Sequence, residues 1–318
     1  MKQQLAVGID IGGTNTVFGI VDRRGNLLCD GAISTKKHAE VTFFIDDLCK
    51  ELSKLIDQVG GAREIKGIGV GAPNGNFFKG TIEFAPNLPW KGVIPLANLM
   101  QDACSLPTVL TNDANAAAIG EMTYGAARGM KNFIMITLGT GLGSGIVVNG
   151  ELMYGHDGFA GELGHVIVNH EGRLCGCGRY GCLETYVSAT GIARTMKELL
   201  DTDQSDSLLR NASPEQITSK SVRDAAVQGD KLAIEAFELT GKMLGQQLAN
   251  FVAFSSPEAI ILFGGLTKAG DLILRPTIHH MEQNLLQIYK NKIRILLSEL
   301  KESDAAILGA SALVWEMK

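Results

Sequence analysis

The sequence predicts an α/β protein made of two duplicated lobes. The main observation is a strand, a glycine-rich turn and a second strand that occur twice, in residues 5–21 and 133–149. Apolar residues at helical spacing and short apolar strands fill much of the remaining chain. The 318 residues are enough for two medium-sized cores. A unit that repeats at this separation indicates an internal duplication.

The composition excludes several classes of function. A net charge of −5 without a long basic run argues against nucleic acid as a partner. No apolar run reaches the length of a membrane span, and the first residues meet Asp10 before a signal-peptide core could form. We therefore expect a cytoplasmic protein that binds neither nucleic acid nor membrane. The 38 glycines exceed average usage and cluster in turns, which suggests close backbone approaches to a ligand.

The first hairpin has the composition of a phosphate-binding turn. Its strands are Leu5 to Ile11 and Val17 to Val21, and Asp10 lies near the end of the first strand. The tip consists of small residues, namely Gly12, Gly13, Thr14, Asn15 and Thr16. Their amides and hydroxyls can face a phosphate, and Asp10 can hold a magnesium-bound water. A tight turn that needs glycine only for its backbone would have the same composition.

The second hairpin favours the phosphate-binding interpretation. Thr137 lies near the end of its first strand, and its turn contains Gly139, Thr140, Gly141, Gly143 and Ser144. Two such hairpins, more than a hundred residues apart, are typical of the actin-like and hexokinase-like ATPase fold. That fold consists of two ribonuclease H-like lobes with a nucleotide clamped between them.

Two competing nucleotide motifs do not fit. A dinucleotide-binding GxGxxG fails because its last position falls on Ser144 when counted from Gly139 and on Ile146 when counted from Gly141. The segment that follows is also a strand rather than a helix. A Walker lysine fails because Lys242, after Gly241, is followed by a methionine.

The chain between the hairpins alternates helix and strand. Val41 to Val59 form an amphipathic helix that glycines end, and Ile65 to Val70 form a buried strand. The turn after this strand contains Asn74, a residue that tolerates a left-handed backbone. Thr108 to Leu110 form a short strand that runs into a helix. Loops at strand ends are where ligands bind in α/β folds.

Asn112, Asp113 and Asn115 lie in the first turn of this helix. Side chains of these types are common helix caps, so a purely structural role is the alternative to a role in binding or catalysis.

Further helices and strands are predicted in the second half of the chain. Tyr186 to Leu200 and Asp224 to Ala253 are expected to be helices, joined by a polar surface connection. Ala259 to Phe263 form an apolar strand that ends at Gly264 and Gly265, where a helix starts. Ile293 to Leu297 form a strand, and Asp304 to Trp315 an alanine-rich helix.

Residues 165–184 contain a predicted zinc loop. Cys175, Cys177 and Cys182 have the short spacing of thiolate ligands, and His165 lies ten residues before the first of them. Four protein ligands would close a tetrahedral site, and a closed site is structural because catalytic zinc keeps a position open for water. The alternative is a loop with ordinary free thiols. The remaining cysteines, Cys29, Cys49 and Cys104, are scattered singly, and we expect them to be reduced rather than paired.

The same loop resembles the signature of the ROK family, which comprises repressors, open reading frames and sugar kinases. The resemblance is carried by CGCGRYGCLE at Cys175 to Glu184 and by GELGH at Gly161 to His165. It extends along the whole chain, and the members most similar to it are bacterial glucokinases. It implies ATP-dependent phosphorylation of a hexose at the 6-hydroxyl, with glucose as the expected substrate and Mg²⁺ accompanying ATP.

The resemblance also implies roles for individual residues. Asp113 matches the catalytic base and Asn112 the sugar ligand beside it. The remaining sugar ligands would be Asn87, Glu162, His165 and Glu184, with His165 binding zinc through one ring nitrogen and a sugar hydroxyl through the other. Gly264 and Gly265 match the place of the adenosine. ROK kinases usually have glycine where Asn74 stands, which bears on the sugar contact nearby.

The family fold makes the first lobe discontinuous, with residues 1–118 and 303–318 in a small lobe and 119–302 in a large lobe. A homodimer or homotetramer is expected. Kinases for mannose, fructose, allose and N-acetylhexosamines share these motifs, so the preferred hexose stays open. A sugar-binding ROK regulator would carry a DNA-binding domain ahead of the first hairpin. We do not expect one here, because this hairpin begins within a few residues of Met1. A zinc-stabilised interaction module would leave Asp10 and Asp113 unexplained.

Overall fold

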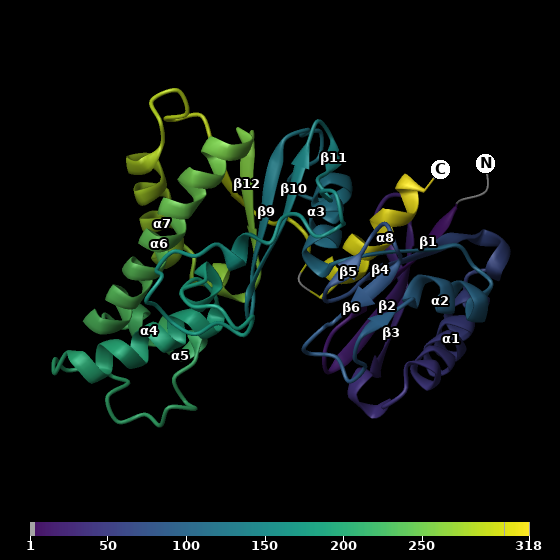
Figure 1. Ribbon diagram of the computed structural model, residues 1–318, viewed down its shortest axis with the longest axis horizontal. Helices are drawn as coiled ribbons and strands as arrows, with labels where there is room; N and C mark the ends of the chain where they lie inside the picture. The colour runs from purple at the N-terminus through teal and green to yellow at the C-terminus, as the bar shows by residue number, and fades with distance from the viewer. Residues whose placement is uncertain (1–3, 302, 318) are drawn as a thin grey trace. The chain divides into compact units, whose positions relative to one another are not determined.

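The structure is a computed structural model that describes residues 4–301 and 303–317. The chain divides into two compact units (Figure 1). Unit 1 comprises Met1–Met130, Gly145–Gly161 and Ser298–Lys318, and unit 2 comprises Lys131–Ser144 and Glu162–Leu297. Each unit is therefore assembled from segments that are distant in the sequence. The predicted lobe limits at residues 118 and 303 stay a prediction, and residue 302 lies outside the described residues.

Unit 1 contains the first predicted hairpin and the strands and helices that follow it. Its elements are β1 (Leu5–Ile11), β2 (Asn15–Asp22), β3 (Leu27–Ser34), η1 (Thr35–Lys37), α1 (Val41–Gln58), η2 (Ala62–Glu64), β4 (Ile65–Gly71), β5 (Gly75–Asn76), β6 (Thr81–Glu83), β7 (Val93–Ile94), α2 (Leu96–Cys104), β8 (Thr108–Thr111), α3 (Asp113–Tyr124), β11 (Glu151–Leu152) and α8 (Ala305–Glu316).

Unit 2 contains the predicted zinc loop and the longest helix, α6 (Lys231–Ser255). Its elements are β9 (Phe133–Leu138), η3 (Leu163–His165), η4 (Leu183–Thr185), α4 (Ala189–Thr202), α5 (Ser219–Val227), α6 (Lys231–Ser255), β12 (Ala259–Phe263), η5 (Gly265–Ala269), α7 (Asp271–Asn284) and β13 (Arg294–Leu297). Strand β10 (Leu142–Val148) begins in unit 2 and ends in unit 1.

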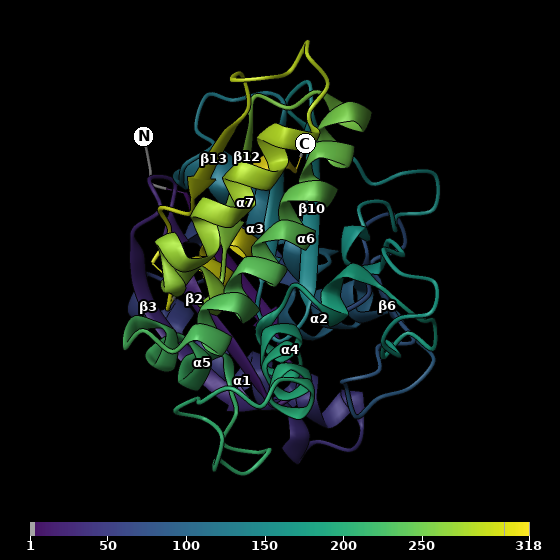
Figure 2. The same cartoon turned by 90° about the vertical axis from the view of Figure 1, so that its left-hand side faces the viewer.

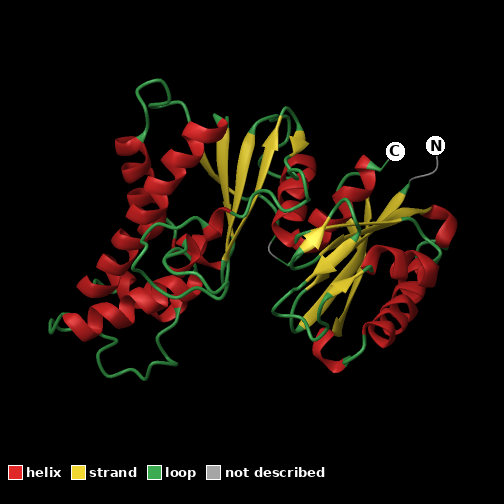
Figure 3. Cartoon of the chain, viewed as in Figure 1, coloured by secondary structure: helices red, strands yellow, loops and turns green. Residues whose placement is uncertain are grey.

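The two large sheets have the same topology, which confirms the predicted duplication. Their strand orders are β3-β2-β1-β4-β8 and β11-β10-β9-β12-β13. Figure 3 shows the strands in yellow. In the first sheet, β1 pairs antiparallel with β2 and parallel with β4, which pairs parallel with β8. In the second, β9 pairs parallel with β12, and β12 pairs parallel with β13. A hairpin at one side and parallel strands at the other therefore occur in both.

Helices cover both faces of the sheet of unit 1. Alternate residues of its strands point to opposite faces, so neighbouring residues contact different helices. Val7 and Ile9 belong to the apolar core that also contains Phe44 of α1. Gly8, between them, faces helix α8, where a Cβ atom would lie 2.0 Å from the Ile307 carbonyl oxygen. Glycine is required there because the helix backbone lies directly against the strand. The C-terminal helix α8 is thus part of the core of unit 1.

Glycine serves the same purpose between two long helices of unit 2. Helices α6 and α7 lie side by side (Figure 2). A Cβ atom at Gly241 would lie 2.6 Å from the Pro276 ring, and one at Gly245 would lie 2.4 Å from the Thr277 carbonyl oxygen. The face of α6 toward α7 is therefore tightly packed.

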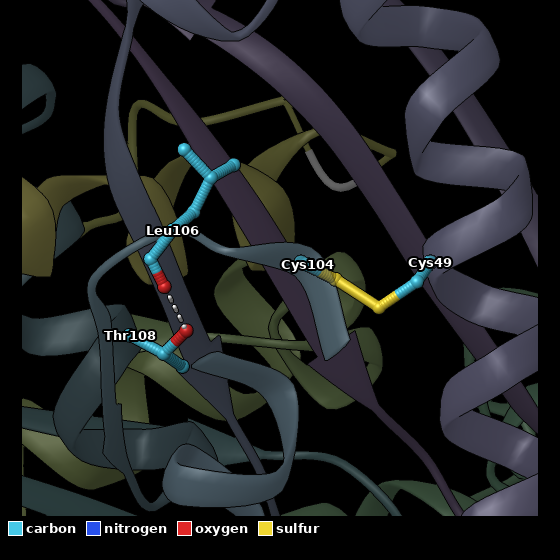
Figure 4. The surroundings of a disulfide bond; sticks show 4 residues. All are labelled: Cys49, Cys104, Leu106 and Thr108. Carbon is cyan, nitrogen blue, oxygen red and sulfur yellow. Dashed lines mark hydrogen bonds between the residues drawn. A yellow bond between two sulfur atoms is a disulfide. The ribbon is translucent and has the colours of Figure 1, made fainter. Parts of the chain in front are cut away.

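Two of the predicted details differ in the structure. The helix predicted over Asp224 to Ala253 is divided into α5 and α6, because Gly229 has a positive φ of 88° and Asp230 caps the second helix. The prediction of unpaired cysteines is wrong for Cys49 and Cys104, which form a disulfide between α1 and α2 (Figure 4). The two residues are 55 positions apart in the sequence, so nothing local indicated that their Cα atoms lie 5.7 Å apart in the fold.

Other predictions are confirmed. Asn74 has a φ of 51°, the left-handed conformation that asparagine was expected to tolerate. The strands predicted at Leu5 to Ile11 and Ala259 to Phe263 have those bounds in the structure. No helix among the described residues is both long enough and apolar enough to span a membrane.

Candidate active site

The tip of the first hairpin lies beside Asn87 in unit 1. The Gly12 amide donates a hydrogen bond to the Asn15 carbonyl oxygen over 3.0 Å, which closes the turn between β1 and β2. A Cβ atom at Gly13 would lie 2.7 Å from the Asn87 carbonyl oxygen. The glycine thus lets the loop that carries Asn87 approach the turn. The Asn87 side chain is exposed.

Two carboxylates gather at the ends of the parallel strands in unit 1. Asp10 of β1 pairs with Gly71 of β4, which in turn pairs with Thr111 of β8. A Cβ atom at Gly71 would lie 3.5 Å from Asp10 Oδ1 and 3.7 Å from the Asp113 Cα. The missing side chain at Gly71 therefore leaves space between the two aspartates. Such strand ends are the usual place for ligands in α/β folds.

Both aspartates have raised pKa values. Desolvation, and then the charge of Asp113, raise the pKa of Asp10 to about 7. Asp113 is exposed to solvent, yet protein surrounds its carboxyl group closely enough for desolvation to raise its pKa. Hydrogen bonds from backbone amides, including that of Ala114, oppose this effect without cancelling it. A raised pKa in a carboxylate at a strand end is typical of a group that exchanges protons.

Asn112, and not Asp113, is the cap of helix α3. Its Oδ1 accepts a hydrogen bond from the Asn115 amide over 2.6 Å, the usual bond of an N-cap. Asp113 is the first helical residue, and its Oδ1 accepts a hydrogen bond from the adjacent Ala114 amide. The cap therefore uses the side-chain oxygen of Asn112 and leaves its amide group to donate hydrogen bonds.

The second hairpin is fixed in unit 2 by the start of helix α4. The Gly139 amide bonds to the Gly141 carbonyl oxygen over 3.1 Å and closes the turn. The Gly139 carbonyl accepts a hydrogen bond from the Ala189 amide, and the Thr140 carbonyl accepts one from Thr190 Oγ1, each over 2.8 Å. The turn is thus held by α4 rather than by its own residues alone.

The glycine pair after β12 lies next to the same turn. Phe263 pairs with Thr137 across β12 and β9. A Cβ atom at Gly264 would lie 2.7 Å from the Leu138 carbonyl oxygen, and its φ of 104° also favours glycine. Thr137 Oγ1 accepts a hydrogen bond from the Gly143 amide over 3.2 Å. Unit 2 therefore brings together the second hairpin and the glycine pair that were expected to contact one nucleotide.

His165, Cys175, Cys177 and Cys182 form a compact cluster in unit 2. Each offers one ligand atom, and these atoms all lie within 4.8 Å of one another. The Sγ atoms of Cys177 and Cys182 are 3.7 Å apart, and Cys175 Sγ is 3.7 Å from His165 Nδ1. Two thiolates on one tetrahedral zinc ion, with Zn–S bonds of about 2.3 Å, would lie roughly 3.8 Å apart. The cluster therefore has the dimensions of a zinc site.

The backbone of this loop also suits a metal knuckle. The Cys177 amide donates to Cys175 Sγ over 3.5 Å, and the Gly178 amide donates to the Cys175 carbonyl. Burial opposes ionisation of Cys177, but hydrogen bonds from Arg179 and the neighbouring thiols lower its pKa to about 6. Burial raises the pKa values of Cys175 and Cys182, so without a metal only Cys177 favours the thiolate form. A thiolate is the form that binds metal.

Glu184 connects the cluster to the second hairpin. Its Oε1 accepts a hydrogen bond from Cys175 Sγ over 3.0 Å and lies 3.7 Å from His165 Nδ1. Its Oε2 accepts a hydrogen bond from the Leu142 amide over 3.4 Å. His165 thus turns Nδ1 toward the thiols, which leaves Nε2 for a second partner. Glu162 has an exposed side chain just before the 3₁₀ turn η3 that carries His165.

The sequence analysis missed Arg173, which holds the loop against α4. Arg173 is 7% exposed and pairs with Glu198 over 2.5 Å. Its guanidinium also donates to the carbonyl oxygens of Thr185 and Gly191 and lies 4.4 Å from the Tyr186 ring centre. In the sequence, Arg173 is only an arginine two residues before Cys175. Its partners can be identified only from the fold.

The predicted site residues divide between the units. Unit 1 carries Asp10, Gly12, Gly13, Thr14, Asn15, Asn87, Asn112 and Asp113. Unit 2 carries Thr137, Gly139, Thr140, Gly141, Glu162, His165, Cys175, Cys177, Cys182, Glu184, Gly264 and Gly265.

The fold is a duplicated α/β fold with a glycine hairpin in each copy. Carboxylates at strand ends and a Cys₃His cluster accompany it. Together these features indicate a kinase-like protein that binds a nucleotide and a sugar. The family model for the ROK family matches residues 6–317, and the chain belongs to this family. It is 36% identical to a glucokinase of Halalkalibacterium halodurans, covering 99% of this chain and 96% of the relative.

Two further comparisons show the range of the family. A crystal structure of a ROK family glucokinase from Streptomyces griseus in complex with glucose and AMPPNP has a TM-score of 0.81 and 33% identity. It covers 98% of this chain and 100% of that one. A xylose repressor of Caldicellulosiruptor bescii is 34% identical over 79% of this chain and 62% of the repressor. These likenesses confirm the predicted fold class.

Proposed function

We propose that this protein is a hexose kinase that transfers the γ-phosphoryl group of ATP to the 6-hydroxyl of glucose. The observation that carries the proposal is Asp113, a carboxylate with a raised pKa whose capping role is filled by its neighbour Asn112. The glucokinase relatives that align along nearly the whole chain support the choice of glucose.

Asp113 is the general base in this proposal. It accepts the proton of the 6-hydroxyl as the oxygen attacks the γ-phosphorus, and the leaving ADP takes the electron pair of the broken bond. Phosphoryl transfer needs positioned phosphates, charge neutralisation and an oriented nucleophile, with little covalent work from the protein. A raised pKa makes the carboxylate a stronger base near neutral pH.

The proposed sugar ligands are side chains that form directed hydrogen bonds. Asn87 and Asn112 supply amide groups from unit 1, and Asn112 offers mainly its NH₂ group because its oxygen caps α3. Unit 2 supplies Glu162, Glu184 and Nε2 of His165. Carboxylates, amides and imidazoles suit vicinal hydroxyls because each accepts or donates in defined directions.

The nucleotide would be bound by the two hairpins and by the glycine pair after β12. Backbone amides at the hairpin tips can donate to phosphate oxygens. Asp10 fits a water of the Mg²⁺ that accompanies ATP, because its carboxylate lies at the strand end beside the first tip. The ion would neutralise phosphate charge.

Zinc would be held by His165, Cys175, Cys177 and Cys182 in a closed structural site. Its binding would fix the loop that carries both His165 and Glu184, since binding energy at such a site is folding energy. Kinases for other hexoses remain the first alternative, because the same residues can hold mannose, fructose, allose or an N-acetylhexosamine.

A second candidate, a sugar-binding regulator without catalysis, is supported by the similarity to a xylose repressor. A coupled ADP-release assay across a panel of hexoses separates the candidates. We expect ADP release that depends on sugar and is highest with glucose. Sugar binding without ADP release would identify a regulator, and neither binding nor release would leave a zinc-stabilised interaction module. Sedimentation of the same sample tests the proposed homodimer or homotetramer.

A further inference from the structure

Unit 2 contains a cavity of about 400 Å³ that none of the proposed site residues lines. It lies between helices α4 and α6, next to Arg173 and Tyr186. Its volume is within the range of about 300–1,000 Å³ that is common for small-molecule sites. The opposite side of α6 packs tightly on α7 through Gly241 and Gly245, so the hollow is confined to the α4 side.

One buried polar group beside the cavity has no hydrogen-bond partner among the described residues. Thr240 is 2% exposed, and among the described residues its Oγ1 has no hydrogen-bond partner. This hydroxyl is closed to solvent, so a ligand would reach it only if neighbouring side chains move. The neighbouring wall is apolar and consists of Leu199, Leu239 and Met243. A ligand that fits would combine an apolar body with at least one polar group.

The charges at the cavity favour an anion. Arg173 is neutralised by Glu198, over 2.5 Å, and by carbonyl oxygens. Lys242, which also lines the cavity, makes no ion pair with any residue in the part of the chain that the structure describes. Lys242 is exposed, so water screens its attraction for an anion, and the apolar wall must supply the rest of the affinity.

We propose that this cavity is a second binding site, which takes a small amphipathic carboxylate with its anionic group at Lys242 and its apolar body against Leu199, Leu239 and Met243. Occupancy would be communicated to the sugar through Arg173. The Arg173 amide donates to the Tyr186 hydroxyl over 3.1 Å, and its guanidinium donates to the Thr185 carbonyl over 2.6 Å. Thr185 follows Glu184 directly, so a shift of Arg173 moves a proposed sugar ligand. This second step depends on the proposed function.

The binding step can be tested with three probes of one shape. We would titrate the purified protein with 4-phenylbutyrate, 4-phenylbutanol and 4-phenylbutylamine by calorimetry. The carboxylate should bind at millimolar concentration or below, and roughly fivefold or more tightly than the alcohol, because Lys242 contributes only to the anion. The amine should bind more weakly still. Equal affinities for all three, or no binding of the carboxylate, would overturn the site.

A charge reversal gives the sharper comparison. Lys242→Glu should invert the order, so that the amine binds more tightly than the carboxylate. Lys231→Glu is the matched control, since Lys231 is an exposed lysine on the same helix that does not line the cavity. It should leave the order unchanged. An unchanged order in Lys242→Glu, or the same inversion in Lys231→Glu, would show that the probes bind elsewhere.

The coupling step is measured as glucose affinity with and without saturating 4-phenylbutyrate, again by calorimetry. We expect a change of about twofold or more that Arg173→Lys abolishes, because lysine cannot keep the forked contacts to Glu198 and Thr185. Unchanged glucose affinity would overturn the coupling. Absence of glucose binding under all conditions, with the probe still bound, would contradict the proposed function and leave the cavity site supported.

Discussion

Asn112 and Asp113 have different roles in the structure. From the sequence alone, either residue could have been the helix cap. The Asn112 oxygen caps α3, while the Asp113 carboxyl, whose pKa is raised by desolvation, does not serve as the cap. A cap needs an oxygen that accepts from the backbone, and a base needs an oxygen that accepts a proton from substrate. The division lets the second residue change without loss of the helix start.

We therefore predict that Asp113→Asn separates binding from chemistry. Asparagine has nearly the same shape, so glucose affinity and thermal stability should stay close to those of the wild type. Turnover should fall by roughly 10² to 10⁴, because the amide cannot accept the proton. Turnover and glucose affinity measured on this variant provide the check. Wild-type turnover would remove Asp113 from the mechanism.

Asp10 provides a prediction about pH and stability. Its pKa is raised from 3.8 to about 7 in the folded protein. Between these values the unfolded chain loses the proton that the folded protein retains, so this group lowers stability as pH rises through the window. The Asp10→Asn variant has no ionisable group at this position, so its stability does not decrease with pH for this reason. Its melting temperature relative to wild type should rise from pH 4 to pH 8.

Thermal unfolding across that pH range is the measurement for Asp10. Asp46→Asn, which changes an exposed aspartate of helix α1 in the same unit, is the control and should show no such trend. A melting-temperature difference that is constant with pH would contradict the assigned cause.

At the scale of elements, the zinc loop is the part most dependent on a ligand. We predict about one zinc ion per chain in protein purified under reducing conditions without chelator. Cys177→Ser should lose the metal and loosen the loop, whereas Cys29→Ser, a cysteine of unit 1, should retain it. Metal analysis of the three proteins decides this. Full retention by the Cys177 variant would exclude the assigned ligands.

The close contact between the sheet of unit 1 and α8 predicts the effect of a single methyl group. A Cβ atom at Gly69 would lie 1.9 Å from the Ala310 carbonyl oxygen, so Gly69→Ala must displace the helix. We expect a loss of about 1–3 kcal/mol or more in the free energy of unfolding. Gly61→Ala, at a φ of 91° but in open space, measures backbone strain alone and should cost about 1–2 kcal/mol. Urea unfolding compares the two.

Regular elements were predictable because their signal is local. The alternation in Leu5 to Ile11 and the apolar spacing in Val41 to Val59 are properties of adjacent residues, and the structure confirms both elements closely. The position of Asn74 was likewise a matter of local backbone preference. The break at Gly229 was missed because apolar spacing continues on both sides of it.

Parts of the candidate site could be predicted for the same reason, and others could not. The Cys₃His cluster was evident because its ligands lie within eighteen residues of one another. The partners of Arg173 and the pairing of Cys49 with Cys104 depend on which helices pack together. No local pattern contains that information.

At the scale of the whole molecule, the duplicated sheets differ in the chemistry at matching positions. Asp10 lies two residues before Gly12, and Thr137 lies two residues before Gly139. One copy of the hairpin therefore carries a carboxylate suited to a hydrated cation, and the other carries a hydroxyl that is bonded to the Gly143 amide. The copies share a backbone plan, but they are suited to different parts of a nucleotide.

The disulfide between α1 and α2 lies wholly within unit 1, which predicts a selective effect. It closes a sequence separation of 55 residues, and removing such a crosslink costs typically about 2–4 kcal/mol. The double variant Cys49→Ala, Cys104→Ala should lose amide protection in α1 and α2, while α6 and α7 exchange as in wild type. Hydrogen exchange resolves the two units. Equal loss in both would show that they unfold together.

The packing of α8 against β1 and β4 also has a consequence for synthesis on the ribosome. Residues 162–297 are translated before α8, although they belong to the other unit. At about 5–20 residues per second, one face of the first sheet stays uncovered for on the order of ten seconds. During that time the nascent chain presents apolar surface to chaperones. A codon change that slows translation after residue 161 would prolong this exposure without altering any residue of the finished protein.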